Sequence, residues 1–186
     1  MEQLPAGARV GTSSLRRVVQ LRCLRPDLQY VPLRGNVDTR LRKCDEGVVD
    51  AVVLALAGMN RLGFHDRYTH ALEPELSLPA VGQGALAIEI RSDDSELHTA
   101  LQALNDPETE IAIAAERGVM LAVEGSCQVP VAGYATRQGD QMWLRALLAE
   151  PDGSNLRRAE VRTPWPSSFE VAFECGKQLG AQLKGQ

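Results

Sequence analysis

Aromatic residues and long apolar stretches are scarce in this sequence, and each shortage argues against a class of function. Phe, Trp and Tyr together make up 4% of the residues, which leaves few side chains to stack on the bases of a single-stranded nucleic acid. No apolar run is long enough to span a bilayer, and the first residues lack the pattern of a signal peptide. We therefore expect a cytoplasmic protein that binds neither nucleic acid nor a membrane.

Closely spaced metal ligands are missing as well. The 4 cysteines are widely separated, without a Cys-x-x-Cys pair, and the 3 histidines form no group. Structural zinc sites need such ligand pairs, so no metal site is predicted. Free thiols in a reducing compartment are the simplest interpretation.

Lysine is the scarce basic residue, because only 3 of the 20 basic residues are Lys and the others are Arg. Although the net charge is −4, residues 9–43 carry nine cations against two carboxylates. Arginine binds carboxylate or phosphate through a planar pair of donors, which the point charge of lysine does not offer. A solvated basic face would explain each arginine singly, but the cluster as a whole indicates an anionic ligand.

The first half of the sequence alternates short strands with helices. Strands are predicted at residues 8–10, 30–33 and 50–57, and helices at 15–25 and 37–44. Thr12, Ser13 and Ser14 are favourable capping residues before the first helix, and Asn36 precedes the second. Free N–H groups and the positive dipole end of a helix start attract anions. Capped helices without a ligand would explain the same pattern.

Three segments follow the carboxyl ends of these strands, namely Thr12–Arg17, Arg34–Arg40 and Gly58–Arg61. Ligands of open α/β sheets collect outside that edge. We therefore expect the three segments to line one rim, which combines arginine side chains with helix starts.

The second half of the sequence changes character after a loop rich in Gly and Pro at residues 77–84. We predict a strand at 85–90, followed by helices at 94–104 and from 105 to Gly125. After them we predict strands at 128–137, 141–150 and 155–162 and a final helix at 167–183. Cys127 falls on a short loop between a helix and a strand.

Four stretches in this order are together typical of one family. They are Gly11-Thr-Ser-Ser-Leu-Arg-Arg17, Leu33-Arg-Gly-Asn-Val-Asp-Thr-Arg40, Leu78-Pro-Ala-Val-Gly-Gln-Gly84 and Glu124-Gly-Ser-Cys-Gln-Val-Pro130. With them the chain resembles porphobilinogen deaminase, also called hydroxymethylbilane synthase, over nearly its whole length.

The resemblance implies a transferase of tetrapyrrole (haem) biosynthesis. Members of the family join four porphobilinogens into hydroxymethylbilane on a dipyrromethane cofactor, which a thioether attaches to a loop cysteine that Cys127 matches. The residues that match the cofactor-binding positions are Ser13, Arg16, Arg17, Arg34 and Arg40, and those that match substrate-binding positions are Arg34, Arg40, Arg61, Thr12 and Gln83. Because Cys127 follows a predicted helix C-terminus, where the dipole disfavours a thiolate, we expect it to be an anchor rather than a turnover nucleophile.

The resemblance also implies a division into domains. Residues 1–78 correspond to a periplasmic-binding-protein-like α/β domain that binds anions and substrate. Residues 79–104 correspond to a hinge and a segment that returns to another family domain. Residues 105–186 correspond to a small α+β domain, a three-stranded antiparallel sheet with helices, which anchors the cofactor.

The catalytic aspartate of the family has no counterpart in the matched motifs. In the family it belongs to an N-terminal segment, and this chain begins almost at the second domain. Asp38, Asp50 and Asp66 lie in no corresponding motif, so the catalytic residue stays unassigned. We expect the chain alone to be inactive, with the missing segment as a candidate partner besides porphobilinogen, and we expect family members to be monomers.

A non-catalytic module that binds carboxylates or other anions is the alternative. It accounts for the arginines and the helix starts but leaves Cys127 without a role. Nucleic-acid binding through residues 9–43 is a third hypothesis, which salt-dependent binding to DNA of any sequence would support.

Overall fold

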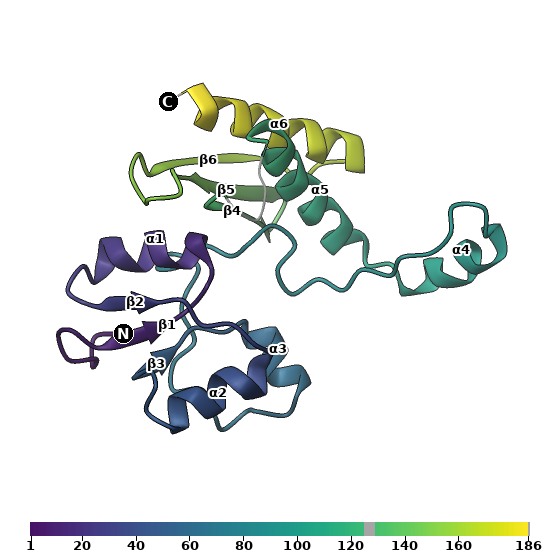
Figure 1. Ribbon diagram of the computed structural model, residues 1–186. Coiled ribbons are helices and arrows are strands. Elements are labelled where there is room, and N and C mark those ends of the chain that lie inside the picture. Colours follow the sequence, from purple (N-terminus) through teal and green to yellow (C-terminus); the bar gives the residue numbers. More distant parts are fainter. Residues whose placement is uncertain (125–128, 186) are drawn as a thin grey trace.

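The computed structural model describes residues 1–124 and 129–185, which form two three-stranded sheets with their helices. In Figure 1 the parallel sheet of the first part lies below the antiparallel sheet of the last part, and a long connection joins them. Within these described ranges no helix is long and apolar enough to cross a membrane.

The first sheet is parallel and has the strand order β2-β1-β3. Its strands are β1 (Arg9–Gly11), β2 (Gln29–Val31) and β3 (Ala51–Val52), and the helices that follow them are α1 (Leu15–Leu24), α2 (Val37–Asp45) and α3 (Leu56–Arg61). Val10 on the central strand and Leu21 on α1 are fully buried, because each crossover returns its helix to the sheet. The predicted alternation of strands and helices is confirmed.

The strand predicted at residues 50–57 is wrong in its length. Only Ala51–Val52 pair with β1, and α3 already begins at Leu56. In the described sheet β3 is an edge strand with one neighbour. The apolar residues that follow Asp50 are compatible with one long strand and with a short strand followed by a helix, so their composition alone could not decide the length of the strand. Gly58–Arg61 therefore lie inside α3 and not in a loop after the strand.

The second sheet is antiparallel and has the order β4-β5-β6, as predicted. Its elements are α5 (Pro107–Ala122), β4 (Val131–Gln138), β5 (Gln141–Leu148), β6 (Arg157–Pro164) and α6 (Phe169–Gly185). Both helices cover one face of the sheet (Figure 1), and the core between them contains fully buried Val119, Leu144 and Leu183. The three-stranded antiparallel sheet with helices is confirmed, whereas the likeness of the first part to periplasmic binding proteins and the division into domains stay predictions.

Glycines allow α5 and α6 to approach each other closely. A Cβ atom on Gly118 would collide with the carbonyl oxygen of Phe173, and one on Gly176 would collide with that of Ala115. At Gly180 an added Cβ would lie 2.7 Å from the carbonyl oxygen of Val119. Because these neighbours are backbone atoms, larger residues would force the two helices apart.

The strand predicted at residues 85–90 is absent from the structure, and this prediction is wrong. No other described segment pairs with these residues, and a strand needs a hydrogen-bonded neighbour. The helix after it is shorter than predicted, with α4 (Ser95–Leu101) followed by the 3₁₀ helix η1 (Gln102–Leu104). Leu86, Ile88 and Leu104 are 80%, 59% and 69% exposed, and Figure 1 shows the segment extending away from both sheets.

Candidate functional site

The start of α1 is open to a ligand. Ser14 is the N-cap residue, but its side chain makes no capping hydrogen bond. Thr12 is 2% exposed, and its hydroxyl accepts a hydrogen bond from the Ser14 N–H at 3.2 Å, whereas Ser13 is exposed. The positive end of the α1 dipole is therefore not satisfied by the helix's own cap.

Arg16 is the most buried arginine of this region, with 8% exposure. Its guanidinium donates to the carbonyl oxygen of Leu78 at 2.5 Å and to Oε1 of Gln83 at 3.0 Å. Burial, and then the positive charge of Arg17, lower the pKa of Arg16 to about 10. A buried cation that has only neutral partners favours the approach of an anion.

Arg17 and Arg40 bring a second helix and the end of β3 to the same place. Arg17 donates to the carbonyl oxygen of Val53 at 2.8 Å, directly after β3. Its pKa is lowered by burial and then by the positive charge of Arg40. Arg40 itself donates to the carbonyl oxygen of Gly35 at 2.8 Å.

The loop before α2 differs from the start of α1, because its helix is already capped. Asn36 accepts a hydrogen bond from the Thr39 N–H at 2.8 Å. Gly35 has φ +126°, and a Cβ there would lie 2.7 Å from the Thr39 side chain, so only glycine fits this turn. The Arg34 side chain beside it is exposed, and the Arg34 carbonyl accepts from Lys43 at 3.5 Å.

Arg61 and Gln83 stand at the margins of the site. Gln83 contacts Arg16, and the neighbouring Gly84 approaches Ala57 at the start of α3. Arg61 is exposed at the C-terminal end of α3. Arg16 and Gln83 are in direct contact, and the charges of Arg17 and Arg40 act on their neighbours in this cluster, whereas no contact recorded in the described residues connects Arg61 to them.

Several carboxylates of the first part pair with arginines outside the candidate site. Asp50 accepts three hydrogen bonds from Arg9, between 2.7 and 3.2 Å, which lower the pKa of Asp50. Asp27 pairs with Arg25 at 2.7 Å. In residues 1–124 and 129–185 no ion pair involves the arginines with candidate binding roles, which are Arg16, Arg17, Arg34, Arg40 and Arg61.

Two buried polar residues at this site were missed in the sequence. Gln20 accepts from the Leu78 N–H at 2.7 Å and donates to the Leu78 carbonyl oxygen at 3.1 Å. Gln20 lies one turn after Arg16 on the buried face of α1, and this spacing could have indicated from the sequence that it contacts the same partner. Glu116 on α5 is 4% exposed and accepts from the Gly82 N–H at 2.7 Å. Its partner is far away in the sequence, so no local pattern could indicate the contact.

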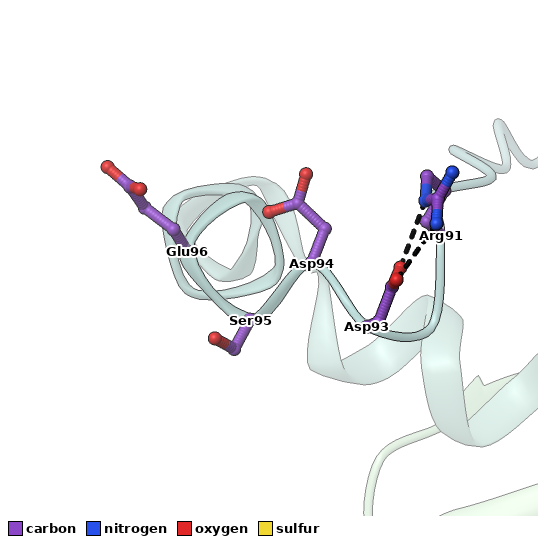
Figure 2. A pocket seen from close by; sticks show the side chains of 5 residues that line it. All are labelled: Arg91, Asp93, Asp94, Ser95 and Glu96. Carbon is purple, nitrogen blue, oxygen red and sulfur yellow. Dashed lines mark hydrogen bonds and ion pairs between the residues drawn. The ribbon is translucent and has the colours of Figure 1, made fainter.

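The hollow drawn in Figure 2 is not part of this site. Figure 2 shows side chains that surround the exposed start of α4, where Arg91 is already paired with Asp93 at 2.9 Å. The residues that line it are Arg91, Asp93, Asp94, Ser95 and Glu96. Its surplus of carboxylates disfavours an anionic ligand.

Cys127, the predicted anchor, lies outside the described residues. The preceding Glu124 has φ 53° and pairs with Lys184 at 2.7 Å. The assignment of Cys127 as anchor, like the other residue assignments made from the sequence, stays a prediction.

Comparison with known proteins decides the family. Residues 1–99 match the family model described as "Porphobilinogen deaminase, dipyromethane cofactor binding domain", and residues 111–185 match "Porphobilinogen deaminase, C-terminal domain". A protein of Sorangium cellulosum named porphobilinogen deaminase is 62% identical over 184 residues. The chain belongs to the porphobilinogen deaminase family. The alignment covers 99% of this chain and 61% of the length of the Sorangium protein.

Membership of the porphobilinogen deaminase family confirms the resemblance. The part of the chain that holds the arginines falls within the match to the dipyrromethane cofactor-binding domain. The cofactor prediction is thus confirmed at the level of the domain.

Proposed function

We propose that this chain forms the anion-binding and cofactor-anchoring part of a transferase that joins porphobilinogens into the linear tetrapyrrole hydroxymethylbilane. The observation that supports the proposal most strongly is the cluster of Arg16, Arg17 and Arg40. Two of the three have a pKa lowered by burial, and none of the three has a carboxylate partner in the described chain. Since each pyrrole unit carries two carboxylates, a chain of pyrroles is a polyanion that requires such cations when it is buried.

The residues present fit a dipyrromethane group. Arg16, Arg17 and Arg40 would hold its carboxylates, and the first N–H groups of α1, with Ser13, would add hydrogen bonds. When bound, the group supplies a pyrrole ring with a free position for the next unit. Cys127 would hold it as a thioether.

Arg34 and Arg61 are proposed to receive the incoming substrate. Both are exposed, so they can bind and release carboxylates with a smaller desolvation cost than Arg16. Exposed arginines also attract an anion from solution and thereby speed its association.

We propose that the active enzyme requires a further polypeptide segment that packs against residues 85–104 and covers them. The exposed apolar side chains of this segment need a cover. In addition, Asp50, the residue directly before β3, is paired with Arg9 at 3.0 Å. We expect the 186-residue chain to give no hydroxymethylbilane from porphobilinogen, and formation of a tetrapyrrole by it would refute this part of the proposal.

The anchor is tested by mass spectrometry of the purified protein after incubation with preassembled hydroxymethylbilane. The expected result is an adduct of four pyrrole units, formed when the Cys127 thiol displaces the hydroxyl group of hydroxymethylbilane as water. Peptide mapping should place the adduct on Cys127, and Cys127→Ser should abolish it. An adduct on Cys23, Cys44 or Cys175 would contradict the proposal. Cytoplasmic location and a monomeric state remain predictions.

A carboxylate-binding module without catalysis is the alternative. It would use the same arginines, but it gives no role to Cys127. A covalent pyrrole adduct on Cys127 would exclude it.

A further inference from the structure

A buried carboxylate on α5 fixes the loop that contacts Arg16. Oε2 of Glu116 accepts from the Gly82 N–H at 2.7 Å, and Oε1 accepts from the Ala135 N–H at 2.9 Å. Both donors are backbone groups, one in the loop of residues 78–84 and the other on β4. Glu116 therefore joins this loop to the C-terminal sheet.

The same loop is held on its other side by α1. Arg16 and Gln20 both donate to the Leu78 carbonyl oxygen, and Gln20 also accepts from the Leu78 N–H. Gln83, the residue after Gly82, accepts from the Arg16 guanidinium at 3.0 Å. A movement of Gly82 would therefore reach Arg16 through the neighbouring residue.

The edge of β4 completes the attachment. The Gly133 N–H donates to the carbonyl oxygen of Pro79 at 3.3 Å, and a Cβ on Gly133 would lie 3.1 Å from the side chain of Val81. The loop is thus attached to β4 by this backbone hydrogen bond, by the bridge through Glu116, and by the buried Leu78 side chain, which packs with Ala132.

We propose that Glu116 is a positioning residue, whose carboxylate fixes residues 78–84 so that Gln83 and the Leu78 carbonyl hold the Arg16 guanidinium in the ligand-binding cluster. The identity of the ligand rests on the proposed function, but the contacts through Glu116 do not. A residue that merely stabilised the fold could be replaced without an effect on ligand affinity in the folded chain.

The chemistry of the two donors explains why a carboxylate occupies this position. An ionised Glu offers an acceptor oxygen to each N–H, whereas Gln offers one oxygen and turns an NH₂ group toward the other donor. Burial raises the pKa of Glu116 to about 7, and the N–H groups of Ala135 and Gly82 oppose that rise. The nearby ionisable groups, Arg117 on α5, Tyr134 and Arg137 on β4 and Arg16 on α1, are not among the causes of the shift.

A double-mutant cycle on the full chain tests the inference. The probe is a synthetic dipyrromethane with four carboxylates, and the variants are Glu116→Gln, Gln83→Ala and the double variant, with exposed Glu110→Gln on α5 as control. Each single variant should weaken probe binding at least fivefold. The double variant should bind no more weakly than Gln83→Ala, because both residues act through Arg16. Additive losses, or wild-type affinity of Glu116→Gln, would overturn the inference.

Two further readouts keep the outcome decisive. If the wild type does not bind the probe, the proposed function fails. Glu116 is then judged by the exchange rate in NMR of the Arg16 Nη–H protons, which donate to Leu78 and Gln83 and should exchange at least tenfold faster in Glu116→Gln. If that variant does not fold, the wild type is followed between pH 6 and 8. Although the ionised carboxylate accepts from both N–H groups, the cost of burying its charge is the larger effect. Loop opening, which hydrates Glu116, is therefore favoured as the carboxyl ionises, so probe affinity and Gly82 amide protection should fall together as pH rises. An affinity that stays constant would overturn the inference.

Discussion

Replacement of Arg16 by Met should stabilise the ligand-free chain while weakening ligand binding. Met keeps a long apolar side chain in the buried position and removes the charge. The fall of the Arg16 pKa from its ordinary value to about 10 corresponds to roughly 3 kcal/mol against the charged form in the folded chain. The hydrogen bonds to Leu78 and Gln83 are lost, at about 1 kcal/mol each. A net gain of about 1 kcal/mol in the free energy of unfolding remains.

The pH dependence of this effect has a definite sign. A folded-state pKa below that of the unfolded chain disfavours the charged arginine at every pH below about 10. The gain from Arg16→Met should therefore be constant between pH 6 and 8. It should shrink only as the pH rises above about 10, where the wild-type guanidinium begins to lose its proton in the folded state.

Urea unfolding, with and without the dipyrromethane probe, measures both parts of the prediction. Exposed Arg158→Met on β6 is the matched control. The probe should raise the unfolding midpoint of the wild type and of the control, but raise that of Arg16→Met much less. A ligand-free Arg16→Met chain less stable than the wild type by about 1 kcal/mol or more would refute the reasoning, because Arg16 would then serve the fold and not the ligand.

Two further predictions concern the C-terminal part. Since the pKa of Glu116 is raised from 4.5 to about 7, the free energy of unfolding should fall by roughly 3 kcal/mol as pH rises from about 4.5 to above 7, and Glu116→Gln should remove that fall in urea titrations at pH 5 and 8. A variant with an unchanged pH dependence would contradict the assignment. Gly118→Ala should cost about 1–3 kcal/mol in thermal unfolding, because its Cβ meets the backbone of α6, whereas Gly185→Ala, with open space around it, should change little.

Elements whose apolar face is covered by other parts of the chain were predictable from the sequence. The helix at Leu15–Leu24 and the three antiparallel strands follow from apolar periodicity and turn residues, because the apolar side of each pattern is buried in the folded chain. Residues 85–90 have the composition of a strand, but no described strand pairs with them. A high strand propensity does not produce a strand where no other strand is available to form hydrogen bonds with it.

The candidate site was predictable only in part. Helix starts and arginines after strand ends indicated Arg16, Arg17 and Arg40, because the carboxyl ends of parallel strands share an edge. The spacing could not indicate that Glu116 reaches Gly82, since this contact depends on how the C-terminal helices meet the connecting loop. Nor could it place Arg61, whose position depends on how early α3 begins.

The central claim is that the guanidinium cluster binds a chain of pyrroles through its carboxylates. Calorimetric titration of the synthetic dipyrromethane into the wild type, Arg17→Met and Arg158→Met tests it most directly. We predict saturable binding of one molecule, weakened about tenfold or more by Arg17→Met, since a hydrogen bond to a charged group contributes about 1.5–3 kcal/mol, and unchanged by Arg158→Met. Absence of saturable binding, or equal losses in both variants, would contradict the account.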